Sequence, residues 1–287
     1  MTTTDTYTYD DNGNILTVGD GTNTTSYVYD SANQLIRENN QAGGFTHTWE
    51  YDNAGNILNR KEYVYTTESL EGVMPTDTVT YTYGDSEWGD LLTAYDGNAI
   101  THDGIGNPLS DGTWTYTWKH GRQMASMSDG STTWSYTYDA DGLRTKRTNG
   151  TDTYSYVYNG GSLSKLTKGS DTLCFTYDAN GAPLTVNYNG TVYYYVTNLQ
   201  GDVTSIINAA GETVADYQYN AWGNPIPETG ETPTALETLN PLRYRGYVYD
   251  EETGLYYVAQ GTVLCVDAER QGDGFAVPFF RRREKNC

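Results

Sequence analysis

The side chains best suited to chemistry in this chain are the acidic and amide groups that gather in short turns. The fullest example is Asp10-Asp11-Asn12-Gly13-Asn14, whose oxygen atoms resemble the ligands of a calcium loop. The downstream glutamate that completes such a loop is absent, and sister turns carry Ala or Ser at the same positions. Because an Asp side chain also caps a turn, turn capping explains the same residues. We predict no metal site, with calcium binding as the alternative.

Histidine is the usual general acid or base near neutral pH, and the chain has three histidines. His47, His102 and His120 lie in different repeats, and none has an evident partner. The chain contains no G-x-S-x-G, H-E-x-x-H or phosphate-binding glycine loop with its lysine. Carboxylates are abundant, but no pair stands out in so acidic a sequence. We predict no catalytic or cofactor-binding residue, and a protein that is not an enzyme.

The formal net charge of −20 argues against nucleic acid as a partner, because phosphate binding requires clustered Lys and Arg. Two basic clusters interrupt the acidic background, Arg144-Thr145-Lys146-Arg147 and Arg281-Arg282-Arg283. Both are short, and we interpret them as solvated charged patches. The acidity is expected to keep a tyrosine-rich β surface soluble.

The cysteines and the hydropathy of the chain give no sign of a disulfide framework, a zinc site or a membrane segment. Cys174, Cys265 and Cys287 form no C-x-x-C pair, so neither a disulfide framework nor a zinc site is predicted. There is no apolar run long enough for a transmembrane segment and no signal peptide at the start. The first residues lead directly into a repeat, which suggests a piece of something longer.

A tyrosine-aspartate turn recurs about every twenty residues, and this period organises the chain. The copies begin at Tyr9, Tyr29, Tyr51, Tyr138, Tyr158 and Tyr177. Between turns, segments such as Trp134-Ser135-Tyr136-Thr137-Tyr138 alternate with the period of two that is typical of strands. Tyr occurs 28 times, and Tyr and Thr favour pleated surfaces. We predict an all-β fold in which each repeat is one β-hairpin.

Three stretches are less regular. Residues 66–112 keep only fragments of the repeat, and we predict looser repeats there, with a long loop around 66–78. Residues 225–241 carry four prolines and are predicted to form a second loop. Residues 258–287 carry a net charge of +1, against −21 for residues 1–257, and have no tyrosine. Such a change indicates a divergent tail, either disordered or read in a shifted frame.

The regular tyrosines and tryptophans permit a binding function, because aromatic faces on a rigid sheet stack on sugar rings. The alternative is that alternate tyrosines pack within the fold, with their hydroxyls reaching solvent. A glycan-binding adhesive module therefore remains a second hypothesis for function.

The most specific sequence motif lies towards the C-terminal end of the repeats. It comprises Tyr194–Val203, Gly211-Glu212, Tyr217–Pro225, Asn240–Tyr247 and Tyr249–Tyr257. Together with the Tyr-Asp turns, it resembles the Rhs or YD-repeat family, which includes bacterial polymorphic toxins, wall-associated proteins and the YD shells of teneurins. On this resemblance, residues 1–190 are YD repeats, residues 191–257 are the Rhs-associated core, and residues 258–287 are the tail.

The resemblance implies a spiralling sheet of hairpins that forms part of a hollow shell around a C-terminal toxin. The expected function is structural, in a secreted or cell-surface bacterial protein, with parent-chain repeats and the toxin cargo as partners and surface glycans as an alternative partner. In several members an aspartate-dependent self-cleavage just beyond the core frees the cargo. This chain departs from the family after Tyr257, so no catalytic aspartate is carried over, and both the cleavage region and the cargo are expected to be missing.

Within the core motif, charge complementarity suggests a structural pairing. We predict that Arg243 and Arg245 pair with the acidic turn Asp250-Glu251-Glu252 and fix the sealing hairpin. Gly246 and Gly254 are predicted to permit tight backbone turns.

Overall fold

The computed structural model describes residues 5–226, 233–258 and 262–264. Strands dominate these residues, and each strand pairs antiparallel with the next along the chain within its sheet. The prediction of an all-β fold made of consecutive hairpins is therefore confirmed. The chain forms two compact units, Met1–Ile100 and Thr101–Cys287. This division falls within the irregular stretch 66–112, whereas the boundary between repeats and core near residue 190 remains a prediction.

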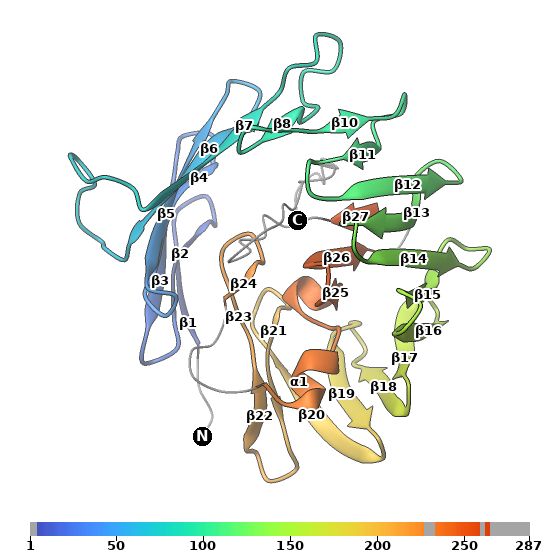
Figure 1. Cartoon of the computed structure of the whole chain (residues 1–287). Helices are drawn as coiled ribbons and strands as arrows, with labels where there is room; N and C mark the ends of the chain where they lie inside the picture. Colours follow the sequence, from blue (N-terminus) through green and yellow to red (C-terminus); the bar gives the residue numbers. More distant parts are fainter. Residues whose placement is uncertain (1–4, 227–232, 259–261, 265–287) are drawn as a thin grey trace. The chain divides into compact units, whose positions relative to one another are not determined.

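The first unit, blue to blue-green in Figure 1, contains a nine-stranded sheet in which strand order follows sequence order. Its strands are β1 (Thr6–Tyr9), β2 (Ile15–Gly19), β3 (Thr24–Tyr29), β4 (Leu35–Asn40), β5 (Phe45–Tyr51), β6 (Ile57–Val64), β7 (Asp77–Thr82), β8 (Ala94–Tyr95) and β9 (Asn98–Ala99). The long loop expected around 66–78 is the connection between β6 and β7, residues 65–76.

The second unit contains a thirteen-stranded sheet, again in sequence order. Its strands are β10 (Thr101–His102), β11 (Pro108–Ser110), β12 (Thr115–Lys119), β13 (Gln123–Ser128), β14 (Thr133–Tyr138), β15 (Arg144–Thr148), β16 (Thr153–Asn159), β17 (Ser162–Lys168), β18 (Asp171–Tyr177), β19 (Pro183–Tyr188), β20 (Thr191–Thr197), β21 (Val203–Ile207) and β22 (Thr213–Asp216). Then follow β23 (Gln218–Tyr219), β24 (Pro225–Ile226), α1 (Ala235–Leu239), the 3-10 turn η1 (Tyr244–Gly246), β25 (Val248–Asp250), β26 (Leu255–Val258) and β27 (Thr262–Leu264).

A register shift accompanies the Tyr-Asp turns. In the first hairpin Thr8 pairs with Thr17, but the next residue, Tyr9, pairs with Ile15, so the returning strand carries one extra residue. The same shift occurs where Tyr138 pairs with Arg144. Such a bulge changes which residues of the returning strand share a face, because it breaks the strict alternation.

The bulge places residues three apart on the same buried face of the sheet. The pairs Met124/Met127, Leu163/Leu166 and Val203/Ile206 follow this spacing, and each of these side chains is at most 3 % exposed. Together with the alternating tyrosines of the outgoing strands, they form the core of the second unit. Core residues are therefore two positions apart in the strand before each turn and three positions apart in the strand after it.

Two C-terminal segments differ from the simplest expectation. Residues 225–241, predicted as a loop, begin with β24 and contain the short helix α1. The helix forms because Thr234 and Glu237 make a reciprocal capping box, in which each side chain accepts the other's backbone N–H. Beyond Tyr257, β26 continues to Val258 and β27 pairs with it; the rest of the predicted divergent tail lies outside the described residues. No helix in the described ranges is long and apolar enough to cross a membrane.

Candidate functional site

The arginines of β15 are buried, which corrects their interpretation as a solvated patch. Arg144 is 2 % exposed and Arg147 is 4 % exposed. The bulge after Tyr138 puts both on the core face, because Arg144 pairs with Tyr138 and Arg147 pairs with Tyr136. In the other repeats of this sheet with the same bulge, these positions hold Met, Leu, Pro, Val or Ile. An alignment of the repeats on their turns would have revealed two arginines at core positions.

Carboxylates from the C-terminal segment pair with both arginines. The Arg144 Nη1 and Nη2 atoms donate to the two Asp250 oxygens at 2.5 and 2.7 Å. Arg147 Nη1 donates to Glu252 at 2.5 Å, and the Tyr154 hydroxyl donates to the other Glu252 oxygen. A bidentate guanidinium–carboxylate pair is strong and directional. We call these five residues the clasp; Asp250 lies 106 positions after Arg144.

Aromatic rings enclose the arginines of the clasp. The Arg144 guanidinium lies 4.5 Å from the ring centroid of Tyr257 and 4.9 Å from that of Tyr156, and the Arg147 guanidinium lies 3.8 Å from that of Tyr154. Burial alone would lower the pKa of Arg144, but Asp250 opposes this and holds the pKa above its ordinary value. The guanidinium stays charged because its carboxylate partner and the ring faces replace the lost water.

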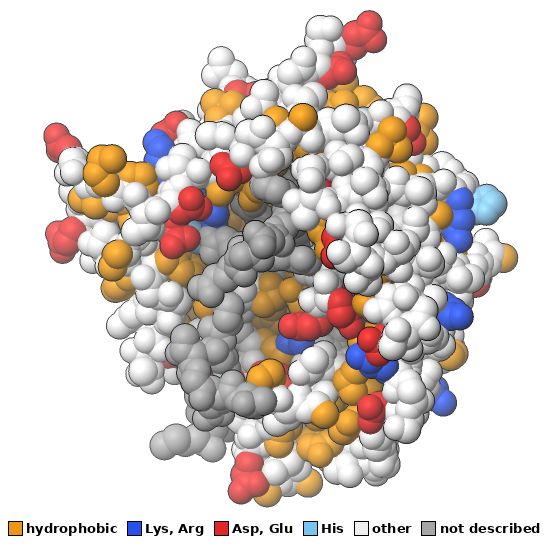
Figure 2. Space-filling model, viewed as in Figure 1, with side chains coloured by type: hydrophobic (Ala, Val, Ile, Leu, Met, Phe, Trp, Pro, Cys, Tyr) orange, Lys and Arg blue, Asp and Glu red, His pale blue; other side chains and the backbone are white. Residues whose placement is uncertain are grey.

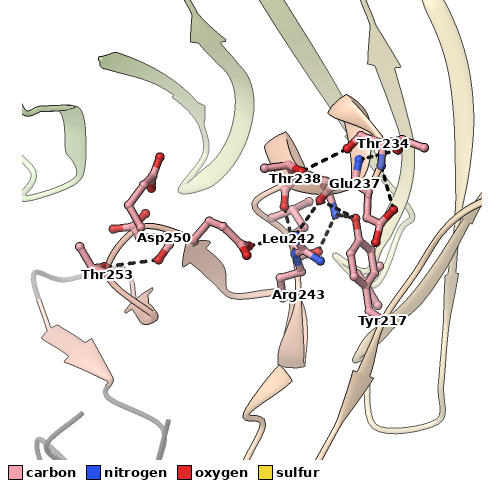
Figure 3. Close-up of polar contacts among 12 residues, drawn as sticks. Tyr217, Thr234, Glu237, Thr238, Leu242, Arg243, Asp250 and Thr253 are labelled. Atoms are coloured by element: carbon pink, nitrogen blue, oxygen red, sulfur yellow. Dashed lines mark hydrogen bonds and ion pairs between the residues drawn. The ribbon is translucent and has the colours of Figure 1, made fainter. Parts of the chain in front are cut away.

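A second arginine contact ties the same C-terminal segment to α1 and to Tyr217, the residue after β22. Arg243 is buried against the Tyr217 ring, with its guanidinium 3.7 Å from the centroid (Figure 3). Its Nη2 donates to the Glu237 carbonyl at 2.7 Å and lies 3.5 Å from the Glu251 carboxylate. The predicted pairing of Arg243 with the acidic turn is therefore present, and Figure 2 shows acidic and basic side chains together around β25.

The predicted pairing of Arg245 with the acidic turn is wrong. Arg245 instead contacts Asp202, whose carboxylate accepts the Arg245 backbone N–H at 2.9 Å and lies 3.5 Å from Nε. The cause is local, because Arg245 has a left-handed backbone with φ 54° and directs its groups towards the 198–202 turn. Gly246 and Gly254 both have φ of 68°, which confirms the predicted tight turns.

The Tyr-Asp turns are held by their own side chains. In the first turn, Asp10 Oδ1 accepts the backbone N–H groups of Asn12 and Asn14 at 2.9 and 2.8 Å, and Oδ2 accepts the Asn14 amide at 2.8 Å. The oxygens considered as calcium ligands are thus used in turn capping. Among the described residues, no group of three or more His, Cys, Asp or Glu is arranged to hold a metal ion.

Turn capping predicts that acid destabilises the fold. The Asn14 amide lowers the pKa of Asp10, and backbone N–H groups of Asn56 and Ala182 lower those of Asp52 and Asp178. A carboxylate with a lowered folded-state pKa stabilises the protein above its unfolded pKa of about 4, and this stabilisation is lost as pH falls through the folded value. Urea denaturation should show a falling midpoint below about pH 4. Asp178→Asn, which keeps a capping oxygen, should reduce that dependence; an unchanged pH profile would contradict the assignment.

In several turns an acid at one end accepts from an amide at the other, as in Asp103–Asn107 at 2.8 Å, or the two exchange places, as in Asn198–Asp202 at 2.7 Å. In the turn from Asn220 to Asn224 both ends are asparagine. The Asn224 amide is in a residue only 3 % exposed and has no hydrogen-bond partner among the described residues.

Asn220→Asp is therefore expected to stabilise the protein by about 1 kcal/mol, because the new carboxylate accepts the Asn224 amide as well as two backbone N–H groups. Asn208→Asp is the matched control, since it sets a carboxylate against Glu212, which accepts the Asn208 amide at 2.8 Å. Urea denaturation of both variants provides the measurement. Equal effects of the two substitutions would refute the pairing rule.

Comparisons with known proteins agree with this geometry. Residues 166–264 match the family model of the teneurin YD-shell. The tRNA3(Ser)-specific nuclease WapA of Bacillus spizizenii and the tRNA nuclease WapA of Bacillus subtilis are each 33 % identical to the chain over 261 residues, covering 86 % of this chain and 10 % of the relative. The chain thus spans about a tenth of the length of these relatives.

Two solved structures share the fold. One is a TcdB2-TccC3-Cdc42 structure, with a TM-score of 0.60 and 15 % identity over 91 % of this chain and 15 % of that chain. The other is the Photorhabdus luminescens Tc holotoxin pore carrying the TccC3-D651A mutation, with a TM-score of 0.57 and 15 % identity over 89 % of this chain and 15 % of that chain. The chain belongs to the Rhs/YD-repeat family.

The aromatic residues of this YD-repeat segment are mostly part of its packing. None of its six tryptophans is exposed, and among its 28 tyrosines only Tyr9 and Tyr194, at 47 and 42 %, are exposed. Tyrosine hydroxyls bond inside the fold, as where Tyr51 and Tyr177 each donate to a backbone carbonyl of a neighbouring repeat. Few of the aromatic side chains that motivated the glycan-binding hypothesis are therefore exposed.

The histidines of the YD-repeat segment lie in separate environments. His47 is fully buried on β5, with Nε2 3.3 Å from Glu62 and 3.4 Å from Arg60. His102 lies on the short strand β10, and His120 occupies a turn with φ 47°. His47 thus has charged neighbours that sequence spacing did not indicate, because β5 and β6 pair it with Glu62 across the sheet.

Proposed function

We propose that this chain is a non-enzymatic wall segment of a YD-shell that encloses and presents a C-terminal effector. The parent is a secreted or surface bacterial protein, and the cargo lies outside this chain. Residues 240–257 act as the seal of the shell, because their charged side chains form ion pairs with a strand of the wall. The partners are further repeats of the parent chain and the enclosed effector.

The clasp is the observation that carries this proposal. A seal must be held against the wall by contacts that join distant parts of the chain, and the clasp joins β15 to the end of β25 and the turn after it. Its Arg144–Asp250 pair is buried, so water does not compete with it as it does at a surface pair. Its aromatic surroundings supply packing rather than a cleft, since the cavity beside Arg144 and Asp250 has a volume of about 10 Å³.

The test is a segment exchange in the Bacillus subtilis tRNA nuclease, replacing the matching stretch with this chain. The exchanged protein should resist limited trypsin digestion as the unmodified protein does, whereas a version lacking the stretch should be digested. The clasp variant Arg144→Met should be digested faster, and Lys146→Met on the same strand should not. Equal protection with and without the stretch would rule out a wall function.

The non-enzymatic part of the proposal is tested on the isolated chain. Incubation with bulk tRNA should leave the tRNA intact, because the described residues present no paired acid and base in an open cleft. Mass spectrometry of the incubated chain should show one intact mass. A discrete cleavage near residue 257 would instead support the self-cleaving alternative.

A further inference from the structure

Asparagine followed by glycine occurs five times in the chain, each time at a hairpin turn. Such a pair can react with itself, because the glycine nitrogen attacks the asparagine side chain and no side chain on the glycine hinders the approach. The nitrogen must first lose its proton to water, so its N–H has to be open to solvent. The pairs are Asn12-Gly13, Asn149-Gly150, Asn159-Gly160, Asn180-Gly181 and Asn189-Gly190.

In four of the five pairs, the glycine N–H donates a hydrogen bond within its own hairpin. The acceptors, in chain order, are the Asp10 carbonyl at 3.1 Å, the Thr148 hydroxyl at 3.1 Å, the Asp178 carbonyl at 3.2 Å and the Asn187 side-chain oxygen at 2.8 Å. The asparagine side chain can be held as well, as where the Asn189 amide donates to Asp171 at 2.8 Å. Reaction at these four pairs requires that such hydrogen bonds break first.

The pair at the tip of the β16–β17 hairpin is different (Figure 1). Asn159 pairs with Ser162, so Gly160 and Gly161 form a two-residue turn, with φ of 59° and 87°. In a turn of this type the hydrogen bonds join the residues on either side of the tip, and the tip N–H groups point outwards. Asn159 and Gly160 are exposed. Among the described residues, neither the Asn159 side chain nor the Gly160 N–H has a hydrogen-bond partner.

We propose that Asn159 is a site of spontaneous covalent modification in the folded protein. The Gly160 nitrogen loses its proton to water and attacks Asn159 Cγ, and the side-chain amide group takes up a proton and leaves as ammonia. Water then opens the cyclic imide at either carbonyl, which leaves aspartate or isoaspartate. The consecutive glycines of the tip favour the reaction, because their backbone rotates freely into the geometry of attack.

The modification changes both charge and backbone at this tip. Either product adds a negative charge to the hairpin, and isoaspartate also adds its β-carbon to the main chain. The inference is independent of the proposed wall function, because it depends only on the local structure of the β16–β17 turn.

The experiment follows all five asparagines in the full chain during incubation at mildly alkaline pH, by peptide mapping with mass spectrometry. We expect Asn159 to react about tenfold faster than any of the other four, because their glycine N–H groups must first be released from hydrogen bonds. Hydrogen exchange should likewise be fastest at Gly160, because exchange also requires an open N–H. In urea that unfolds the chain, the five rates should become similar, because every asparagine then has the same neighbour and no fixed hydrogen bonds.

Variants test the cause of the difference. Asp171→Ala with Asn187→Ala removes the acceptors of the Asn189 amide and of the Gly190 N–H, and should raise the rate at Asn189 without changing that at Asn159. Asn159→Gln should abolish modification of the β16–β17 tip alone, because the longer side chain forms a cyclic imide less readily. Reaction at Asn159 no faster than at the other four, rate differences that persist in urea, or an unchanged rate at Asn189 in the double variant would overturn the proposal.

Discussion

Replacing Arg144 with methionine is expected to lower the free energy of unfolding by about 3–5 kcal/mol, the range for breaking a buried ion pair by removing one partner. Both side chains of the Arg144–Asp250 pair are 3 % exposed, so the variant leaves Asp250 as a buried carboxylate. Arg147, whose Nε lies 3.5 Å from Asp250, compensates for the lost charge only in part, because it already pairs with Glu252. Urea denaturation at neutral pH provides the measurement.

Two comparisons make that prediction specific to the clasp. Lys146→Met changes the same strand on its exposed face and should cost less than about 0.5 kcal/mol. The double variant Arg144→Met with Asp250→Leu removes both charges and should recover much of the loss, because apolar replacements of a buried pair are often neutral. If Arg144→Met is no more harmful than Lys146→Met, the clasp does not hold the C-terminal segment.

Gly223→Ala is expected to cost about 3 kcal/mol, from backbone strain and overpacking together. Gly223 has φ 85°, and an added Cβ would lie 2.4 Å from the Tyr244 ring. That ring has little freedom to move, because it packs against the rings of Tyr219 and Tyr256 at centroid distances of 5.9 and 6.4 Å. The substitution therefore displaces η1 from the turn that precedes β24.

The matched control is Gly211→Ala, at the same position of another turn. Gly211 has φ 82°, and an added Cβ would meet nothing within 4 Å, so only the backbone strain of about 1–2 kcal/mol applies. Urea denaturation of the two variants isolates the packing contribution of Tyr244. Identical losses would mean that Tyr244 does not press on the turn.

The sequence alone predicted the local architecture well because that architecture depends on short-range rules. A Tyr-Asp turn followed by an alternating segment predicts a hairpin, and the structure contains consecutive hairpins throughout the two large sheets. Asp10 was predicted to cap its turn, and its carboxylate does so. Gly246 and Gly254 were predicted to permit tight turns, and both have positive φ. Each of these inferences concerns residues a few positions apart.

The sequence predicted the candidate site only in part because its contacts join distant residues. Arg243 was paired correctly with the acidic turn, since both belong to one motif. Arg144 and Arg147 were misassigned because a period of two places residues three apart on opposite faces, and only the bulge reverses this. Arg245 was misassigned because its left-handed backbone directs it to Asp202.

By itself, the sequence determined the β-hairpin repeat, its acidic character and the family to which the chain belongs, because turn residues and alternation act locally. Only the tertiary structure decided that Asp250 and Glu252 meet Arg144 and Arg147. Burial makes that choice, because a guanidinium removed from water must find a carboxylate, and which carboxylate lies within reach depends on how residues 240–257 pack against β15.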